Sequence, residues 1–279
     1  MGMKMKKCLT SIVIHICLIL GALVFLLPFY WILRSATMDI MQVFSVPPKW
    51  IPDPIIISNF AEALTILPFD LYFKNTFFVV LIGVVGTVLT ASLSAYSFAR
   101  LHWHGKNIFF ALIMSTMMLP YAAKLIPTFL GWKMLGCIDT YIPLVLPAWF
   151  GGTAFDMFLF RQFFMTIPKE LDEAAKMDGA GHGRIFFQII LPLSKPAVVS
   201  VALFAFMGFW NDFLGPLVYL NDQKKFTVAL GLAQFQGMLT SEWQLMMAAA
   251  AVVIIPVLIV FLLGQKYFVE GIAATGLKG

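Results

Sequence analysis

Long apolar runs separated by short polar connections occupy almost the whole of the 279-residue chain. A bilayer is spanned by about 20 apolar residues in a helix, and six runs of the chain reach that size. Their expected bounds are 11–33, 71–98, 108–130, 141–160, 198–220 and 245–267. The pattern therefore predicts an all-α membrane protein with six transmembrane helices. The third run contains Pro120 and Pro127, so we expect that helix to be kinked or broken near its outer end.

The first apolar run follows a short basic segment with three lysines. A signal peptide is the alternative interpretation, but its apolar region is about 7–15 residues long, and no small-residue cleavage site ends this longer run. We therefore expect a retained membrane helix with a cytoplasmic N-terminus. Four prolines between positions 47 and 54 favour an extended outer connection. The expected organisation is residues 1–70 for the first helix and the proline-rich extracytoplasmic loop, 71–267 for a transmembrane domain, and 268–279 for a cytoplasmic tail.

Small side chains recur every four residues along the second run, at Gly83, Thr87, Ala91, Ala95 and Ala99. This spacing places them on one face of a helix. Membrane helices approach each other closely through such faces, so we expect the second helix to be buried among others.

Composition narrows the class of protein further. Hydrophobic residues make up 61% of the chain and charged residues 12%, against about 25% charged in soluble proteins, which excludes a soluble globular domain. With six spans and a cytoplasmic N-terminus, twelve of the 19 lysines and arginines lie on the inner side, in agreement with the positive-inside rule. They do not cluster on one soluble face, which excludes a nucleic-acid surface. The three cysteines, Cys8, Cys17 and Cys137, lack the spacing of a disulfide framework or a metal site.

The longest polar island, at about 166–196, predicts a helix, a turn and a second helix. Three acids, Glu170, Asp172 and Glu173, occupy the expected first turns, where the helix dipole favours them. Asp178 and Gly179 then break the helix, because glycine tolerates the left-handed conformation common at helix ends. Such a hairpin is too short to be a domain, so we expect it to dock on another protein.

Residues of this hairpin resemble the cytoplasmic loop signature of the permease subunits of binding-protein-dependent ABC importers of type I. The matching positions, at the spacing of the signature, are Glu173, Ala174, Ala175, Gly179, Ile189, Leu191 and Pro192. The resemblance implies that the hairpin, between the fourth and fifth spans, is a coupling helix that docks in a cleft of a separate ATPase, with Asp178 and Ala180 in the same contact. It also implies a second homologous permease, an ATPase dimer that uses ATP and magnesium, an extracytoplasmic solute-binding protein, and no cofactor in this chain.

Three further stretches are similar to the sugar-importing branch of that family, in particular the smaller permease of maltose-type importers. They are the proline-rich segment 44–52, the sequence Trp210-Asn211-Asp212, and the C-terminal Thr275, Gly276, Leu277, Lys278 and Gly279. The resemblance implies import of a sugar or oligosaccharide, and contact of the tail with the ATPase. A permease for a polyamine, an anion or a peptide is the alternative. A secondary transporter would need internal repeats, which the sequence does not show.

No Walker A, GxSxG or HExxH pattern occurs in the chain, so no enzyme activity of these classes is expected. Candidate residues of the translocation path are Lys124, Trp210, Asn211 and Asp212. At about 1.5 Å per residue, Lys124 and Asp212 reach a similar depth in two outward-running helices, which makes them a candidate ion pair. The alternatives are that Lys124 extends to the headgroups, that Trp210 is an anchor at the membrane interface, that Asn211 and Asp212 serve structural packing, and that Asp212 caps a helix end or meets outer water. Asp156 and Arg161 are expected to pair with each other or with the membrane interface.

Overall fold

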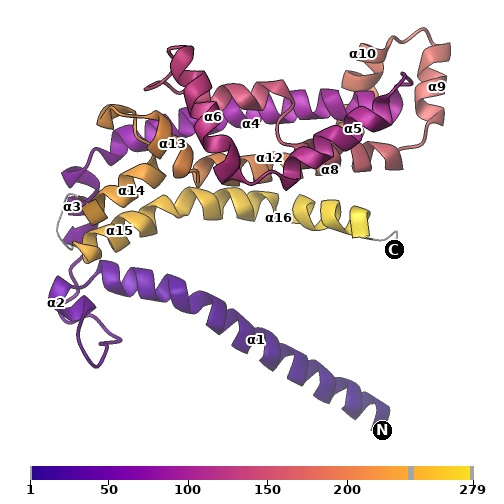
Figure 1. Cartoon of the computed structure of the whole chain (residues 1–279). Helices are drawn as coiled ribbons and strands as arrows, with labels where there is room; N and C mark the ends of the chain where they lie inside the picture. The colour runs from indigo at the N-terminus through magenta and orange to yellow at the C-terminus, as the bar shows by residue number, and fades with distance from the viewer. Residues whose placement is uncertain (1, 238–241, 277–279) are drawn as a thin grey trace. The chain divides into compact units, whose positions relative to one another are not determined.

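The computed structural model describes residues 2–237 and 242–276, and within these ranges every regular element is a helix. The prediction of an all-α membrane protein is confirmed. Single helices long and apolar enough to cross a bilayer, among the described residues, are Ser11–Ala36, Phe69–Arg100, Ile142–Thr166 and Trp243–Lys266. Two bent pairs, Lys106–Met118 with Tyr121–Met134 and His182–Leu193 with Lys195–Trp210, raise the number of candidate spans from four to as many as six (Figure 1).

The chain divides into two compact units, and the first consists of Met1–Pro68 together with Leu232–Ile255. Its helices are α1 (Gly2–Ala36), α2 (Ile40–Val43), α3 (Ser58–Ile66) and α15 (Trp243–Val253). The small side chains of α15, such as Ala248 and Ala249, are fully buried and let α15 pack against α1 and α3.

The turn after α1 is fixed by polar side chains rather than by packing alone. Asn59 at the start of α3 is buried and donates hydrogen bonds to the carbonyl oxygens of Ala36 at 3.0 Å and Met38 at 2.8 Å. Asp39 accepts a hydrogen bond from the backbone N–H of Gln42 and caps α2. The segment of four prolines is not helical, as predicted, but α3 was not expected within the connection.

The second unit, Phe69–Gly231 with Pro256–Gly279, is built around α4 (Phe69–Arg100). This helix packs against α8 (Ala154–Thr166) and α12 (Lys195–Trp210), as Figure 1 shows. The predicted face of small residues is buried, with Ala91 and Ala95 fully enclosed. At Gly83 any added side-chain carbon would collide with the ring of Phe209, so the absence of a side chain there permits the approach of α12.

Four of the six predicted spans are interrupted, the sixth of them at Ile254, between α15 and the last helix. In the third, α5 (Lys106–Ser115) and α6 (Tyr121–Met134) meet at a 101° bend with Pro120 at the N-cap, which confirms the predicted break. In the fourth, α7 (Ile142–Val145) and η2 (Leu146–Phe150) precede α8, because Gly151 and Gly152 adopt positive φ angles of 108° and 64°. The fifth is interrupted between α12 and α13 (Leu214–Tyr219).

The segment after the fifth span was expected to be a polar loop up to Trp243, and that expectation is wrong. It contains η4 (Gln223–Lys225) and α14 (Val228–Gly237). Val228, Leu230 and Phe235 are buried, and their burial stabilises a helix that a short stretch between two polar segments did not suggest. The last helix, α16, spans Ile255–Gly276.

Candidate functional site

The signature residues lie on a helix–turn–helix, as predicted. Its elements are α9 (Glu170–Met177), α10 (His182–Ile185), the π-helical turn η3 (Phe186–Ile190) and α11 (Leu191–Leu193). Pro192 does not end the second arm, which continues to Leu193. A π-helical turn inside a helix is often associated with function.

The turn between the two arms depends on Gly179, whose φ is +78°. The N–H of Gly179 donates to the carbonyl of Lys176, and the N–H of Ala180 donates to the carbonyl of Ala175, both at 2.9 Å. This pair of bonds is a Schellman motif, which satisfies the last carbonyls of α9. Glycine is therefore required at position 179 for the direction in which α10 leaves α9.

The signature divides between two faces of the hairpin. Ala175 is buried with Ile185 and Ile190 in the core cluster that also holds Phe160 and Phe164 of α8. Ile189 and Leu191 are half-buried against the same cluster, while Pro192 is exposed. The opposite face exposes Glu173, Ala174, Asp178, Gly179 and the side chain of Met177, which is 89% accessible. This face is therefore the part of the hairpin that is open to another protein.

Arg100, at the end of α4, ties this hairpin to the helix bundle. Its Nη2 donates a 2.8 Å hydrogen bond to the carbonyl of Ile167, and its Nε lies 3.7 Å from Oδ2 of Asp172. Both side chains are almost fully buried, at 2% and 11% exposed. The sequence interpretation considered Asp172 only as an acid in the first turn of a helix and gave Arg100 no role. An arginine that ends an apolar run without any acid nearby in sequence was the available signal.

A cavity of about 390 Å³ lies among α4, α7, η2, α8 and α12. Its lining includes Thr87, Phe155, Asp156, Phe209 and Asp212. Of the predicted path residues, the structure thus places Asp212 at a cavity.

The other predicted path residues lie elsewhere. Trp210 is 1% exposed and packs against Phe77 and Phe206, with ring centroids 5.2 and 5.4 Å apart. Asn211 is exposed and donates to the carbonyl of Met207. Trp210 is therefore a packed core side chain, and Asn211 bonds to the backbone of its own helix.

Lys124 and Asp212 form no ion pair in the part of the chain that the structure describes. Lys124 is exposed on α6. Oδ1 of Asp212 accepts a 3.0 Å hydrogen bond from the N–H of Gly215 at the start of α13, which agrees with the capping alternative.

The expected pairing of Asp156 with Arg161 is wrong. Asp156 and Thr153 form a capping box at the N-terminus of α8, where Oδ2 of Asp156 accepts from the N–H and the hydroxyl of Thr153. The guanidinium of Arg161 lies 4.2 Å from the ring centroid of Phe110. Residues five apart on a helix do not share a face, unlike those three or four apart.

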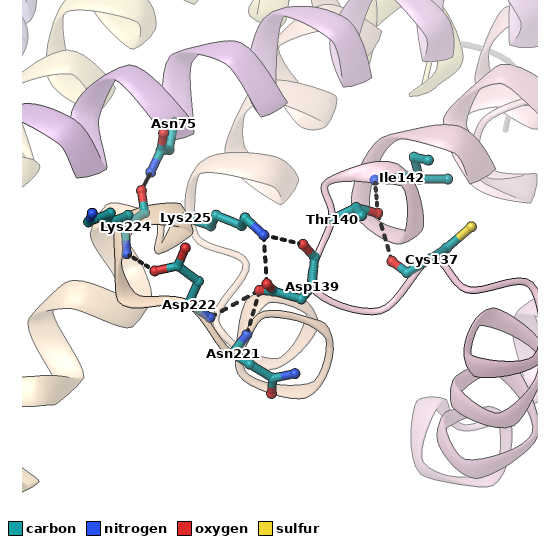
Figure 2. Close-up of polar contacts among 9 residues, drawn as sticks. All are labelled: Asn75, Cys137, Asp139, Thr140, Ile142, Asn221, Asp222, Lys224 and Lys225. Atoms are coloured by element: carbon teal, nitrogen blue, oxygen red, sulfur yellow. Dashed lines mark hydrogen bonds and ion pairs between the residues drawn. The ribbon is translucent and has the colours of Figure 1, made fainter.

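Asp139 joins two connections of the second unit, the one before α7 and the one after α13, as Figure 2 shows. Its Oδ1 accepts from the N–H groups of Asn221 and Asp222 at 2.9 and 3.0 Å, and its Oδ2 lies 2.6 Å from Nζ of Lys225. The backbone N–H of Asp222, followed by Lys225 and the N–H of Asn221, lowers the pKa of Asp139 to about 2. We call these four residues the Asp139 clasp. The side chain of Asn75 on α4 donates to the carbonyl of neighbouring Lys224 at 2.8 Å.

The predicted tail contact cannot be placed as a whole. Thr275 and Gly276 end α16, whereas Leu277, Lys278 and Gly279 lie outside the described residues. No group of three or more potential metal ligands occurs among the residues that the structure describes.

Known proteins resemble this chain over most of its length. Residues 83–273 match the family described as binding-protein-dependent transport system inner membrane component. The chain is 37% identical over 269 residues to the sn-glycerol-3-phosphate transport system permease protein UgpE of Yersinia enterocolitica, covering 92% of this chain and 94% of that protein. It is 33% identical over 279 residues to the UgpE protein of Rhizobium meliloti, covering 97% and 98% of the two chains.

A solved structure has the same fold. The chain superposes with a TM-score of 0.81 and 27% identity on a chain of a bacterial ABC transporter involved in the import of the acidic polysaccharide alginate, covering 93% of this chain and 96% of that one. Because the family match spans more than half of the sequence and the relatives align over nearly all of it, the chain belongs to the family of binding-protein-dependent transport system inner membrane components, and it is a multi-pass membrane protein.

Proposed function

We propose that this chain is the permease subunit of an ABC importer for a sugar or oligosaccharide, and that its hairpin 170–193 couples the helix bundle to a separate ATPase. The observation that supports the proposal best is the two-faced hairpin. One face is buried against the bundle through Ala175, Ile185 and Ile190, and the other presents Glu173 and Met177 to a partner.

The coupling follows from this anchoring. ATP and magnesium are bound and used by the ATPase dimer, and this chain carries no cofactor. When the ATPase subunits close, each pushes a hairpin, and the buried face transmits the movement to α8 and α12. The ion pair of Arg100 and Asp172 transmits it to α4. The bundle then changes the side of the membrane from which its path is open.

The proposed assembly contains a second homologous permease and an extracytoplasmic solute-binding protein, in keeping with the family description. The distribution of lysine and arginine supports cytoplasmic N- and C-termini in the cell membrane. In this arrangement residues 275–279 contact the ATPase.

The names of the relatives support a polyhydroxylated cargo. The UgpE proteins are named for sn-glycerol-3-phosphate transport, and the solved transporter imports the polysaccharide alginate. Both cargoes carry several hydroxyl groups. A polyamine or a peptide has no such support here, whereas both of these cargoes are also anions, so the anion alternative has the same support.

The test of coupling compares two glycines of the hairpin. Gly179→Val forces a β-branched residue into a left-handed conformation, at a cost of about 1–3 kcal/mol, and misdirects α10. Gly181 has φ −75° and ψ 165°, which valine adopts readily, so Gly181→Val is the control. We expect Gly179→Val to insert into the membrane but to lose ATPase copurification or substrate-stimulated ATP hydrolysis, while the control retains both. Normal coupling in Gly179→Val would refute the assignment of the hairpin.

A further inference from the structure

The cavity of the second unit holds two carboxylates, Asp156 and Asp212, at the depth of the membrane-spanning helices. Ionisable groups at such a depth are costly and usually face a bundle interior or a solute pathway. The cavity is also within the range of small-molecule sites, about 300–1,000 Å³. Neither carboxylate forms an ion pair with a lysine or an arginine in the described part of the chain.

Each carboxylate uses one oxygen for the fold and leaves the other available. Oδ2 of Asp156 accepts both hydrogen bonds of the capping box from Thr153. Oδ1 of Asp212 accepts the N–H of Gly215. The second oxygen of each has no hydrogen-bond donor among the described residues. The fold therefore holds two oriented acceptors at one cavity without neutralising their charge.

Glycines make room for both carboxylates. At Gly215 an added side-chain carbon would collide with Oδ2 of Asp212, and at Gly152 it would lie 3.4 Å from Oδ2 of Asp156 and 3.0 Å from Thr87. Gly152 also has a positive φ of 64°, so a larger residue is disfavoured there on two grounds. Of these two glycines Gly152 lines the cavity, so part of the cavity space depends on the backbone at that position.

The remaining walls are largely apolar and include three phenylalanines. Phe155 and Phe204 contact each other edge to face at 5.4 Å, and both line the cavity with Phe209. Phenyl rings offer apolar faces to the C–H surface of a sugar ring, while a carboxylate oxygen accepts hydrogen bonds from hydroxyl groups that are stronger than neutral ones. A phosphate or a carboxylate in the same cavity would meet two like charges in a medium of low dielectric constant.

We propose that this cavity is a cargo site for an uncharged sugar, and that Asp156 and Asp212 make it selective against anionic cargo. The inference rests on the proposed permease function and narrows its cargo. Under this proposal the cargo of this chain differs in charge from sn-glycerol-3-phosphate, for which the relatives are named, and from the acidic polysaccharide that the solved transporter imports.

The first experiment measures the charge of the cavity without requiring transport. Gly208 lines the cavity, and a side-chain carbon added there meets no atom within 4 Å. Gly208→Cys is introduced into a chain whose Cys8, Cys17 and Cys137 are serine, in the full transporter in nanodiscs. It is labelled with hydroxyethyl methanethiosulfonate, which is neutral, and with sulfonatoethyl methanethiosulfonate, which is anionic. Gly131→Cys on α6, which is also unobstructed and does not line the cavity, is the matched control.

The expected result is that Asp212→Asn, and separately Asp156→Asn, raises the rate of the anionic reagent at Gly208→Cys about tenfold, which corresponds to about 1.4 kcal/mol. Asparagine retains one side-chain oxygen, which can still accept the hydrogen bonds from Thr153 or from Gly215. An unchanged labelling rate with the neutral reagent shows that the cavity is intact. The control cysteine should show no change with either reagent. An anionic rate that is insensitive to both substitutions overturns the proposal.

The second experiment measures uptake of radiolabelled sn-glycerol-3-phosphate and of putrescine by the wild-type transporter, whose integrity is checked by its ATP hydrolysis. No uptake of either is expected. Uptake of the phosphate ester overturns the selectivity against anions, and uptake of the diamine shows that the carboxylates serve a cation instead of a sugar. Failure of the permease function itself would appear as an absence of ATPase copurification when the transporter is prepared, whereas failure of this proposal would appear as an unchanged anionic labelling rate in a transporter that does copurify with the ATPase.

Discussion

Removing Arg100 should release the hairpin from the helix bundle while leaving the rest of the fold in place. The guanidinium holds the start of the hairpin segment through the carbonyl of Ile167 and holds α9 through Asp172. At the 3.7 Å separation of Nε and Oδ2, two unit charges attract each other by roughly 4 kcal/mol with an effective dielectric constant of about 20. Breaking a buried pair by removing one partner costs about 3–5 kcal/mol, because the remaining charge stays buried and unpaired.

The expected consequence of Arg100→Met is a local one. A loss of about 3 kcal/mol in the free energy of hairpin opening raises the open population roughly a hundredfold, and amide hydrogen exchange in α9 should accelerate by the same factor. Hydrogen exchange with mass spectrometry on the transporter in nanodiscs measures it. Arg184→Met is the matched control, since Arg184 is exposed and bonds only to Gln188 one turn away within the described residues.

A double-mutant cycle decides whether the ion pair is responsible. Replacing both partners with apolar residues removes the unpaired charge, so Arg100→Met with Asp172→Leu should be more protected than Arg100→Met alone. If the effects of the two substitutions simply add, the pair carries no coupling energy and the reasoning is refuted. Unchanged exchange in Arg100→Met would refute it as well.

Three other predictions concern the second unit. The pKa of Asp139 in the folded protein, about 2, lies below its ordinary value of 3.8. Ionised Asp139 should therefore stabilise the fold above pH 4, and this stabilisation should be lost as the pH falls through 2. In thermal unfolding, Asp139→Asn should lack this dependence on acid and should have a free energy of unfolding lower by about 1 kcal/mol. Gly83→Val should lower the free energy of unfolding by about 1–3 kcal/mol through overpacking. Gly131→Val lies at an unobstructed position and creates no such steric overlap, so its effect in the same unfolding assay should be much smaller. Lys124→Met and Asp212→Asn should have additive effects on uptake, because the described structure does not pair them; restoration of uptake in the double variant would show that the pair forms in another state.

The elements with a strong local signal were predictable from the sequence. The hairpin was predicted because acids, a left-handed glycine and a proline mark its ends within thirty residues, and α4 because its small residues repeat every four positions. Hydropathy reports the length of an apolar run but not its breaks, so the interruption between η2 and α8 was missed. The Gly151-Gly152 pair is a turn signal, and its two positive φ angles account for the interruption.

The parts of the site that escaped prediction depend on contacts distant in sequence. Arg100 and Asp172 are 72 positions apart, and nothing local in either segment indicates the other. Asp156 was expected to pair with a nearby arginine, but the backbone of α8 turns it toward Thr153 and the cavity. Trp210 was considered for the path, yet only the three-dimensional packing distinguishes a core side chain from a lining one.

The Asp139 clasp has a consequence for movement. Its contacts bind the connection before α7 to the segment after α13, and Asn75 adds α4 to the same body. Three helical segments joined at one end share their rigid-body displacement there, so they cannot slide or rotate independently at that end. The relative motion that opens and closes a path must then be absorbed at the interruptions farther along the helices, at Gly151-Gly152 and at the break after Trp210. The helical segments thus move together at the end that the Asp139 clasp holds. The helix breaks allow their opposite ends to move relative to one another.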